Sequence, residues 1–266
     1  MPREITAYSN PLIKWVRDLR DKRHRKQARQ FLAEGLRILT EAKETGRLPT
    51  LLFFAKPSAD HPLVRQLVRA VELAGGEAIE TTPDILSKLS GKDNPQAVVG
   101  VFEELGTTLD MLDRSSSGIW LVAERLRDPG NLGTILRTGD AVGAGGLILV
   151  DQCVDPFSVE AVRASMGAVF TVGLAQARWD EFLPWLRAGE GQLVAASLRD
   201  AVPYRGADYR TPCFILVGNE SQGLPEEYEA ACDLRVTMPM RGRADSLNAA
   251  VAGAVLAYEV LAGVEG

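Results

Sequence analysis

Residues that bind metals or form disulfides are scarce in this sequence. Its 266 residues include only two histidines, His24 and His61, and three cysteines, Cys153, Cys213 and Cys232. The cysteines are odd in number and far apart, which argues against a disulfide framework and against a zinc cluster. We therefore expect no metal site.

Long hydrophobic runs are also absent. No apolar run reaches the roughly 18 residues of a membrane span, and the first residues lack the apolar stretch of a signal peptide. The composition, 46% hydrophobic and 24% charged, is sufficient to bury a core, and the length allows two modest domains. These features predict a cytoplasmic protein with no membrane segment.

Charge is distributed unevenly along the chain. The net charge of -5 combines +6 over residues 1–29 with -11 over the remainder. A basic arm on an acidic body suits a nucleic-acid ligand, because clustered Lys and Arg contact phosphates; the alternative is a solvated helix face. The candidate RNA contacts in this arm are Arg20, Arg23, Arg25 and Lys26.

A change of composition near residues 106–117 predicts a boundary between two domains. Gly106-Thr-Thr and Arg114-Ser-Ser-Ser-Gly118 have the composition of a linker. The first domain, residues 1–106, reads as a small α/β unit. Its predicted helices cover residues 31–45 and 63–74, and its predicted strands cover residues 51–55 and 97–102.

Beyond the linker, in residues 117–266, strands alternate with helices. The predicted strands are 119–123, 146–150, 170–174, 192–196, 213–217 and 234–237. The predicted helices are 132–142, 159–166, 179–188 and 246–261. This alternation predicts an α/β fold with a mostly parallel sheet and helices on both faces. Ligands of such sheets bind beyond the carboxyl ends of the strands.

Three polar loops follow predicted strands in this second domain. In the first, Asn131 is expected to cap the helix from Leu132, and Arg137 is either a phosphate ligand or a solvent-facing residue. In the second, residues 217–225, Glu220 places a carboxylate at a strand end. The third, residues 238–248, is expected to end at Ser246 as the helix N-cap.

Together the three loops resemble the motifs of the SpoU family of RNA ribose methyltransferases, which are trefoil-knotted enzymes. The matching segments are Asp128-Pro-Gly-Asn-Leu-Gly-Thr-Ile-Leu-Arg137, Gly218-Asn-Glu-Ser-Gln-Gly223 and Met238-Pro-Met240 with Ser246-Leu-Asn248. The segment Phe31-Leu-Ala-Glu-Gly-Leu-Arg37 resembles the family's N-terminal substrate-binding domain. The resemblance implies a deep trefoil knot and a homodimer.

The resemblance also implies S-adenosylmethionine as the cofactor. Its expected ligands are Gly218, Asn219, Met238, Met240 and Leu247. The reaction it implies is methyl transfer to a ribose 2′-hydroxyl of structured RNA, and the domain arrangement is most similar to that of enzymes acting on ribosomal RNA. The same reaction on transfer RNA stays open.

Among the expected catalytic residues, the resemblance makes Arg137 the central one. A guanidinium stays protonated in proteins, so we expect it to bind a phosphate and stabilise the developing alkoxide, with Asn131 orienting it. Glu220, Ser246 and Asn248 would complete a polar wall. The group that accepts the proton is open.

Three other functions compete with this interpretation. A 5-methylcytosine enzyme needs a cysteine nucleophile, and Cys213 is the candidate, but it begins an apolar strand and is expected to be a buried small hydrophobe. The glycines of Gly143-Ala-Gly-Gly146 follow a helix rather than a strand, which is typical of a helix stop rather than of a dinucleotide site. A non-catalytic RNA-binding protein would explain the basic arm but not the three loops.

Overall fold

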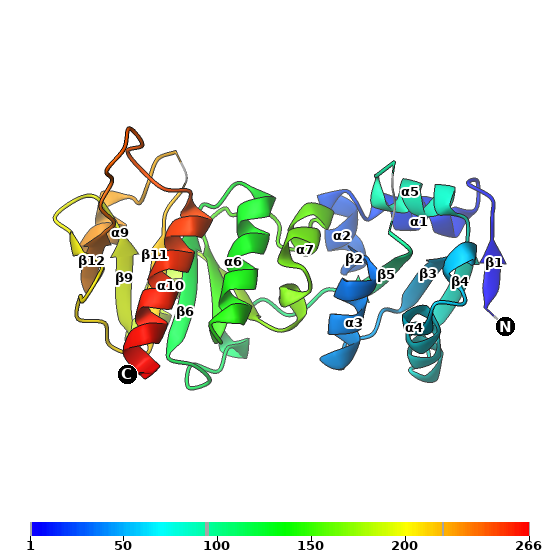
Figure 1. The fold of residues 1–266 in the computed structure, drawn as a ribbon, viewed down its shortest axis with the longest axis horizontal. Coiled ribbons are helices and arrows are strands. Elements are labelled where there is room, and N and C mark those ends of the chain that lie inside the picture. The colour runs from blue at the N-terminus through cyan, green and yellow to red at the C-terminus, as the bar shows by residue number, and fades with distance from the viewer. Residues whose placement is uncertain (1, 94–95, 220, 266) are drawn as a thin grey trace. The chain divides into compact units, whose positions relative to one another are not determined.

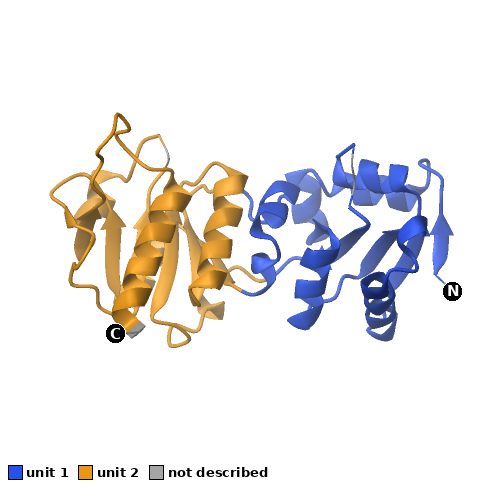
Figure 2. Ribbon diagram, viewed as in Figure 1, with its two compact units in different colours: residues 1–105, 155–171 blue, residues 106–154, 172–266 orange. Residues whose placement is uncertain are grey.

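Two compact units make up the chain, and the computed structural model describes its residues 2–93, 96–219 and 221–265. The first unit combines residues 1–105 with residues 155–171, and the second combines residues 106–154 with residues 172–266 (Figure 2). The expected limits of 1–106 and 117–266 differ from these units in two respects. Residues 107–116, expected to be a linker, belong to the second unit. Residues 155–171 follow a strand of the second unit along the chain but pack within the first.

A mixed sheet forms the centre of the first unit. Its order within the described residues is β1-β4-β3-β5-β2; β1 and β3 run parallel to β4, and β5 runs antiparallel to β3 and β2. The strands are β1 Arg3–Ile5, β2 Gln30–Glu34, β3 Leu51–Ala55, β4 Glu77–Thr81 and β5 Val98–Glu103. The helices are α1 Pro11–Asp18, α2 Lys22–Ala28, α3 Leu36–Glu44, α4 Pro62–Leu73, α5 Pro83–Ser90 and α7 Val159–Ser165, with short 3₁₀ turns η1 Lys56–Ser58 and η3 Ala168–Phe170.

The helix predicted over residues 31–45 is wrong in its first part. Residues 31–34 belong to β2, which pairs with β5, and all four are buried. Gly35 then takes a φ of 99°, which only glycine adopts easily, and α3 begins at Leu36. A strand buried on both faces shows no alternation of apolar and polar residues, so periodicity alone did not separate it from the helix that follows.

An all-parallel sheet forms the second unit. Its order within the described residues is β10-β12-β9-β11-β6-β7-β8. Figure 1 labels four neighbouring strands of this sheet, β12, β9, β11 and β6. The strands are β6 Ile119–Glu124, β7 Gly146–Val150, β8 Gly173–Ala177, β9 Gln192–Ala196, β10 Val202–Pro203, β11 Cys213–Val217 and β12 Leu234–Thr237. The helices are α6 Pro129–Ala141, α8 Trp179–Arg187, α9 Glu226–Ala230 and α10 Ala249–Glu265, and η2 covers Leu109–Met111.

Helices cover both faces of this sheet. On one face, Trp120 of β6 stacks on Phe214 of β11, and both join a core that includes Phe182 of α8. On the other face, α6 packs closely over Leu121 and α10 over Val217. The predicted α/β fold with a parallel sheet and helices on both faces is therefore confirmed.

The strand predicted over residues 170–174 begins later than expected. Residues 168–170 form η3, and β8 starts at Gly173. Phe170 instead packs its ring on Phe31 and Phe102 of the first unit's core.

None of the helices in the described ranges is long and apolar enough to cross a membrane, and the cytoplasmic location stays a prediction.

Candidate active site

Four polar loops begin at one edge of the parallel sheet. Strands β12, β9, β11 and β6 are consecutive neighbours in the sheet, and all run in the same direction. Their carboxyl ends therefore lie together, and so do the loops that follow them. Three of these are the loops singled out in the sequence, and the fourth follows β9.

A cavity of about 330 Å³ lies among these loops. Its lining includes every residue that the sequence assigns to the cofactor: Gly218, Asn219, Met238, Met240 and Leu247. Ser246, expected in the polar wall, lines it too. The cavity thus joins the second and third motifs, and its size falls in the ordinary range for small-molecule sites of roughly 300–1,000 Å³.

Gly218 allows the second motif to turn back closely on itself. A Cβ atom at this position would lie 2.7 Å from the backbone of Gly223 and of Leu224. No real side chain tolerates such a contact without a backbone shift. Gly218 is therefore required where the chain leaves β11 and enters the cavity wall.

Asn219 holds the same loop in place through its side chain. Its Oδ1 accepts hydrogen bonds from the backbone of Ser221 at 3.0 Å and of Gln222 at 3.1 Å. Its Nδ2 donates to the carbonyl oxygen of Arg125 at 2.9 Å, which ties the second motif to the first. The Asn219 side chain therefore holds in place the loop that forms this wall of the cavity.

Asn248, and not Ser246, caps the C-terminal helix. Its Oδ1 accepts from the backbone N–H of Ala250 at 2.9 Å and of Val251 at 3.3 Å, and α10 begins at Ala249. Ser246 donates its hydroxyl to Asp245 instead. The predicted helix start at Ser246 is wrong because asparagine caps at least as well as serine and stands immediately before the apolar run.

The first motif begins with a different cap from the one expected. Asp128 accepts from the backbone N–H of Asn131 at 2.7 Å, and Pro129 opens α6. Pro129 favours this start because its fixed φ suits the first helical position. Asn131 is therefore inside the helix, where its Oδ1 accepts from Nδ2 of Asn248 at 2.8 Å. That bond joins the first and third motifs.

Arg137 lies on the exposed side of α6, two turns from the start of the helix. It makes no hydrogen bond or ion pair with another described residue, so the expected orientation by Asn131 stays a prediction. The expected carboxylate Glu220 lies outside the described residues. Of the five expected catalytic residues, the structure thus joins Asn131 to Asn248 and places Ser246 at the cavity.

The fourth loop adds residues that the sequence analysis missed. Ser197 and Arg199 follow β9 and line the cavity, and both bind the buried carboxylate of Glu229. Ser197 donates to it at 2.6 Å and Arg199 at 3.3 Å. A polar serine and arginine after a buried strand were a usable signal, but only the sheet order places this loop beside the other three.

The basic arm divides into exposed and buried residues. Arg20, Arg23 and Lys26 are exposed. Arg25 is buried, donates to the carboxylate of Asp155 at 2.6 Å, and also donates to two backbone carbonyl oxygens. Because Arg25 is buried and its Nε, Nη1 and Nη2 atoms all donate to the protein, it is removed from the expected RNA contacts.

Two competing interpretations lose their structural basis. Cys213 is fully buried, and burial raises the pKa of its thiol to about 12, which suppresses the nucleophilic thiolate. Gly143, with a φ of 65°, directly follows the end of α6, as a helix stop does. Among the described residues, no three His, Cys, Asp or Glu side chains gather as a metal site would require.

Taken together, these features define an α/β protein with a cavity of small-molecule size at the carboxyl edge of a parallel sheet and with a second α/β unit. The chain belongs to the SpoU rRNA methylase family, which matches residues 118–258. Residues 10–100 match the MRM3-like substrate binding domain. The resemblance inferred from the three motifs is confirmed.

Individual relatives match nearly the whole chain. A solved rRNA methyltransferase of Sinorhizobium meliloti with bound AdoMet is 39% identical, with a TM-score of 0.91 over 98% of both chains. A 23S rRNA uridine 2′-O-methyltransferase of Streptomyces viridochromogenes is 30% identical over 97% of this chain and 92% of its own. A 23S rRNA guanosine 2′-O-methyltransferase of Bacillus subtilis is 26% identical over 97% of this chain and 99% of its own.

Proposed function

We propose that this protein transfers a methyl group from S-adenosylmethionine to a ribose 2′-hydroxyl of ribosomal RNA. The observation that carries the proposal is the cavity at the carboxyl edge of the sheet, where the second and third motifs meet and the first is tied to both. The named activities of the relatives from Streptomyces viridochromogenes and Bacillus subtilis support the choice of reaction and of RNA.

The residues of the cavity suit this cofactor. Met238, Met240 and Leu247 supply an apolar and polarisable wall for an adenine ring or a sulfonium group. Gly218 lets the second motif turn back closely enough to form the neighbouring wall. Arg199 lines the same cavity; one of its nitrogens, Nη1, pairs with Glu229, and the other donors of its 60% exposed side chain would bind the carboxylate of the methionyl part. When bound, S-adenosylmethionine supplies an electrophilic methyl group.

The remaining residues would hold the RNA and the reacting hydroxyl. Arg137 has an exposed guanidinium whose donors match phosphate oxygens, and its positive charge would stabilise the alkoxide that develops as the hydroxyl attacks. Asn131 and Asn248, joined to each other, would fix the ribose beside the cofactor cavity. Ser246 completes this polar side of the site.

The direct test uses tritiated S-adenosylmethionine. The protein is incubated with unmodified ribosomal RNA and, separately, with transfer RNA, and the labelled nucleotide is mapped by digestion and chromatography. We expect one labelled ribose in large-subunit ribosomal RNA. RNA binding without any methyl transfer, together with no S-adenosylmethionine binding by calorimetry, would identify a non-catalytic RNA-binding protein.

Gly218→Val is expected to weaken S-adenosylmethionine binding at least about tenfold. The added atoms meet backbone at 2.7 Å, so the cavity wall must shift, and overpacking of this kind costs about 1–3 kcal/mol. Calorimetric titration measures the effect. Gly242→Val is the matched control, since a Cβ there meets nothing within 4 Å. Equal affinities of both variants would refute the assigned cofactor cavity.

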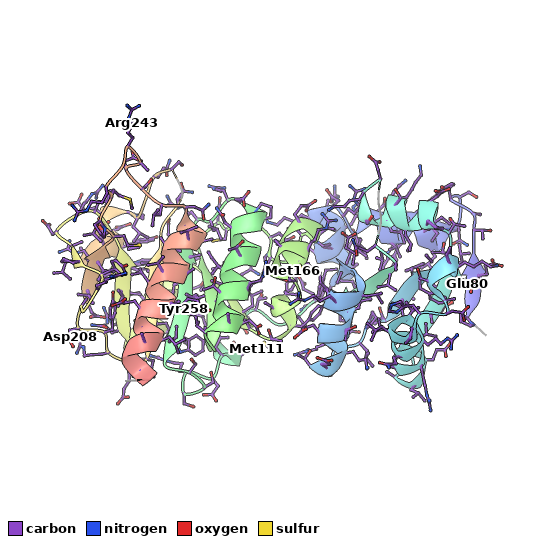
Figure 3. All side chains as sticks on the ribbon, in the orientation of Figure 1. Glu80, Met111, Met166, Asp208, Arg243 and Tyr258 are labelled. Atoms are coloured by element: carbon purple, nitrogen blue, oxygen red, sulfur yellow. The ribbon has the colours of Figure 1, made fainter. Side chains whose placement is uncertain are left out.

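A homodimer is part of the proposal. Val251 and Tyr258 lie seven residues apart on one face of α10, and they are 47% and 52% exposed. Figure 3 labels Tyr258 on this helix. An exposed apolar stripe of this kind is typical of an interface, and α10 packs beside α6, which carries Arg137. A second copy that covered this face would place residues of both subunits at the site.

The double variant Val251→Asp with Tyr258→Asp is expected to be monomeric and inactive. In a dimer, its two added carboxylates would be buried against those of the other copy. The free-energy cost of burying these charges would far exceed the stabilisation from the apolar contacts. Size-exclusion chromatography with light scattering gives the mass. Leu73→Asp, at a 78% exposed position of the first unit, serves as control and should leave the mass unchanged. A dimeric double variant would place the interface elsewhere.

The proposal includes the trefoil knot implied by the family. After β12, at one side of the sheet, the chain returns through α10 to the middle of the unit, where α10 packs on α6, β11 and β6. A knot requires the end of the chain to pass through a loop near the centre of the sheet, an arrangement that most folds avoid. The path of α10 meets the first part of this requirement, since it returns to the centre.

A further inference from the structure

A second cavity lies beside the cofactor cavity within the second unit. Its volume is about 850 Å³, and it opens at the carboxyl ends of β6, β7 and β8. Asn219, Ser221 and Gln222 line both cavities, so a single loop separates them. The proposed methyl transfer leaves this second cavity without a role.

The carboxylates that line it are already engaged by the protein. Asp151 accepts hydrogen bonds from the backbone N–H of Trp179 at 3.0 Å and from the hydroxyl of Tyr228 at 2.8 Å. Glu181 accepts from the backbone N–H of Arg178 at 2.8 Å, closing the start of α8. These acceptors are therefore poorly placed to recruit a cation from solution.

Its arginine donors are available to a ligand in different degrees. Arg127 is exposed and makes no hydrogen bond or ion pair with another described residue. The side chain of Arg125 is 41% exposed, and its Nε lies 3.0 Å from the buried carboxylate of Glu124. Arg178 is paired with Asp180. Guanidinium donors with engaged carboxylates around them favour an anionic ligand.

Backbone conformation gives independent support. Arg125 and Asp151 each stand one residue beyond a strand, β6 and β7, and each takes a positive φ, 44° and 61°. Such conformations are uncommon for residues other than glycine and concentrate at functional sites, where the surrounding structure maintains them. Both residues line this one cavity.

We propose that the second cavity binds the nucleotide next to the methylated one in the RNA strand. Arg127, with Arg125 beside it, would hold the phosphate, and the exposed amides of Gln152 and Gln222 would bind ribose or base edges. An RNA strand is favoured over an acidic peptide because Asn219, Ser221 and Gln222 line both cavities, so a ligand here would lie next to one in the cofactor cavity. The inference rests on the proposed function.

Arg127→Gln tests the inference, with in vitro transcribed large-subunit ribosomal RNA as substrate. We expect KM for RNA to rise about tenfold with kcat within about twofold, and unchanged S-adenosylmethionine affinity by calorimetry. The slope of log affinity for RNA against log salt should become shallower by about 0.7, the value for one lost phosphate contact with a single strand. Arg178→Gln, which removes an arginine of the same cavity that is internally paired, should change neither KM nor slope.

The outcomes separate the two claims. A wild-type protein that transfers no methyl group to RNA overturns the proposed function itself. An active wild type with an unchanged KM and salt slope in Arg127→Gln overturns only the second cavity as an RNA subsite. Equal losses in Arg127→Gln and Arg178→Gln would show general electrostatic attraction, and competition by polyglutamate equal to that by RNA would indicate an acidic peptide; both results overturn the inference.

Discussion

Arg137→Ala is expected to lower kcat for methyl transfer by about 10²–10³-fold at saturating RNA. Removing one preorganised donor to a developing oxyanion has an effect of this size in other enzymes. The side chain is exposed on α6 and makes no hydrogen bond or ion pair with another described residue, so folding should be unaffected. Initial rates with tritiated S-adenosylmethionine measure the change, and calorimetry should show unaltered cofactor affinity.

Arg137→Lys serves as the matched control for charge. It keeps the positive charge but loses the planar donor fork, so its rate should lie between those of the wild type and Arg137→Ala. A lysine variant as slow as the alanine variant would show that bidentate geometry is required. Near wild-type kcat in Arg137→Ala would remove this residue from the reaction.

Asp155→Ala is expected to destabilise the first unit by about 3–5 kcal/mol. The carboxylate pairs at 2.6 Å with Arg25, and the two side chains are only 13% and 5% exposed. Removing one partner of a buried pair leaves the other charge buried without compensation. Urea unfolding followed by circular dichroism measures the loss, and hydrogen exchange of α2 and α7 locates it.

The exposed pair between Arg3 and Glu77 provides the comparison. Its side chains are 55% and 43% exposed, so Arg3→Ala should cost no more than about 1 kcal/mol. If Asp155→Ala lowered the free energy of unfolding by no more than Arg3→Ala does, the attachment of residues 155–171 to the first unit would depend on the Phe157 and Phe170 ring contacts instead.

Local sequence predicted the elements whose pattern is complete within a few residues. Apolar runs such as residues 119–124 and 213–217 are strands at nearly the expected limits, because each is short, buried and bounded by turn residues. The N-caps were assigned less well. Asp128 and Asn248 each stood near another good cap, and only the hydrogen bonds show which one the helix uses.

Contacts between distant residues were beyond local reading. Arg25 belongs to a basic run typical of RNA contacts, yet it is buried because Asp155, 130 residues later, returns to the first unit. The cavity lining from Ser197 and Arg199 depends on β9 lying between β11 and β12. In both cases the residues that become neighbours in the folded protein cannot be read from the adjacent sequence.

The sequence by itself determined the family, the parallel α/β plan and five residues that line the cavity, because motifs and apolar runs are read from residues close together in the chain. Only the tertiary structure decided which polar residues meet. In the folded protein Asn131 is hydrogen-bonded to Asn248, Arg25 is buried, and a second cavity lies next to the loop that contains Asn219. The reason is physical: a side chain's partners are set by sheet order and packing, which bring together residues far apart in the chain.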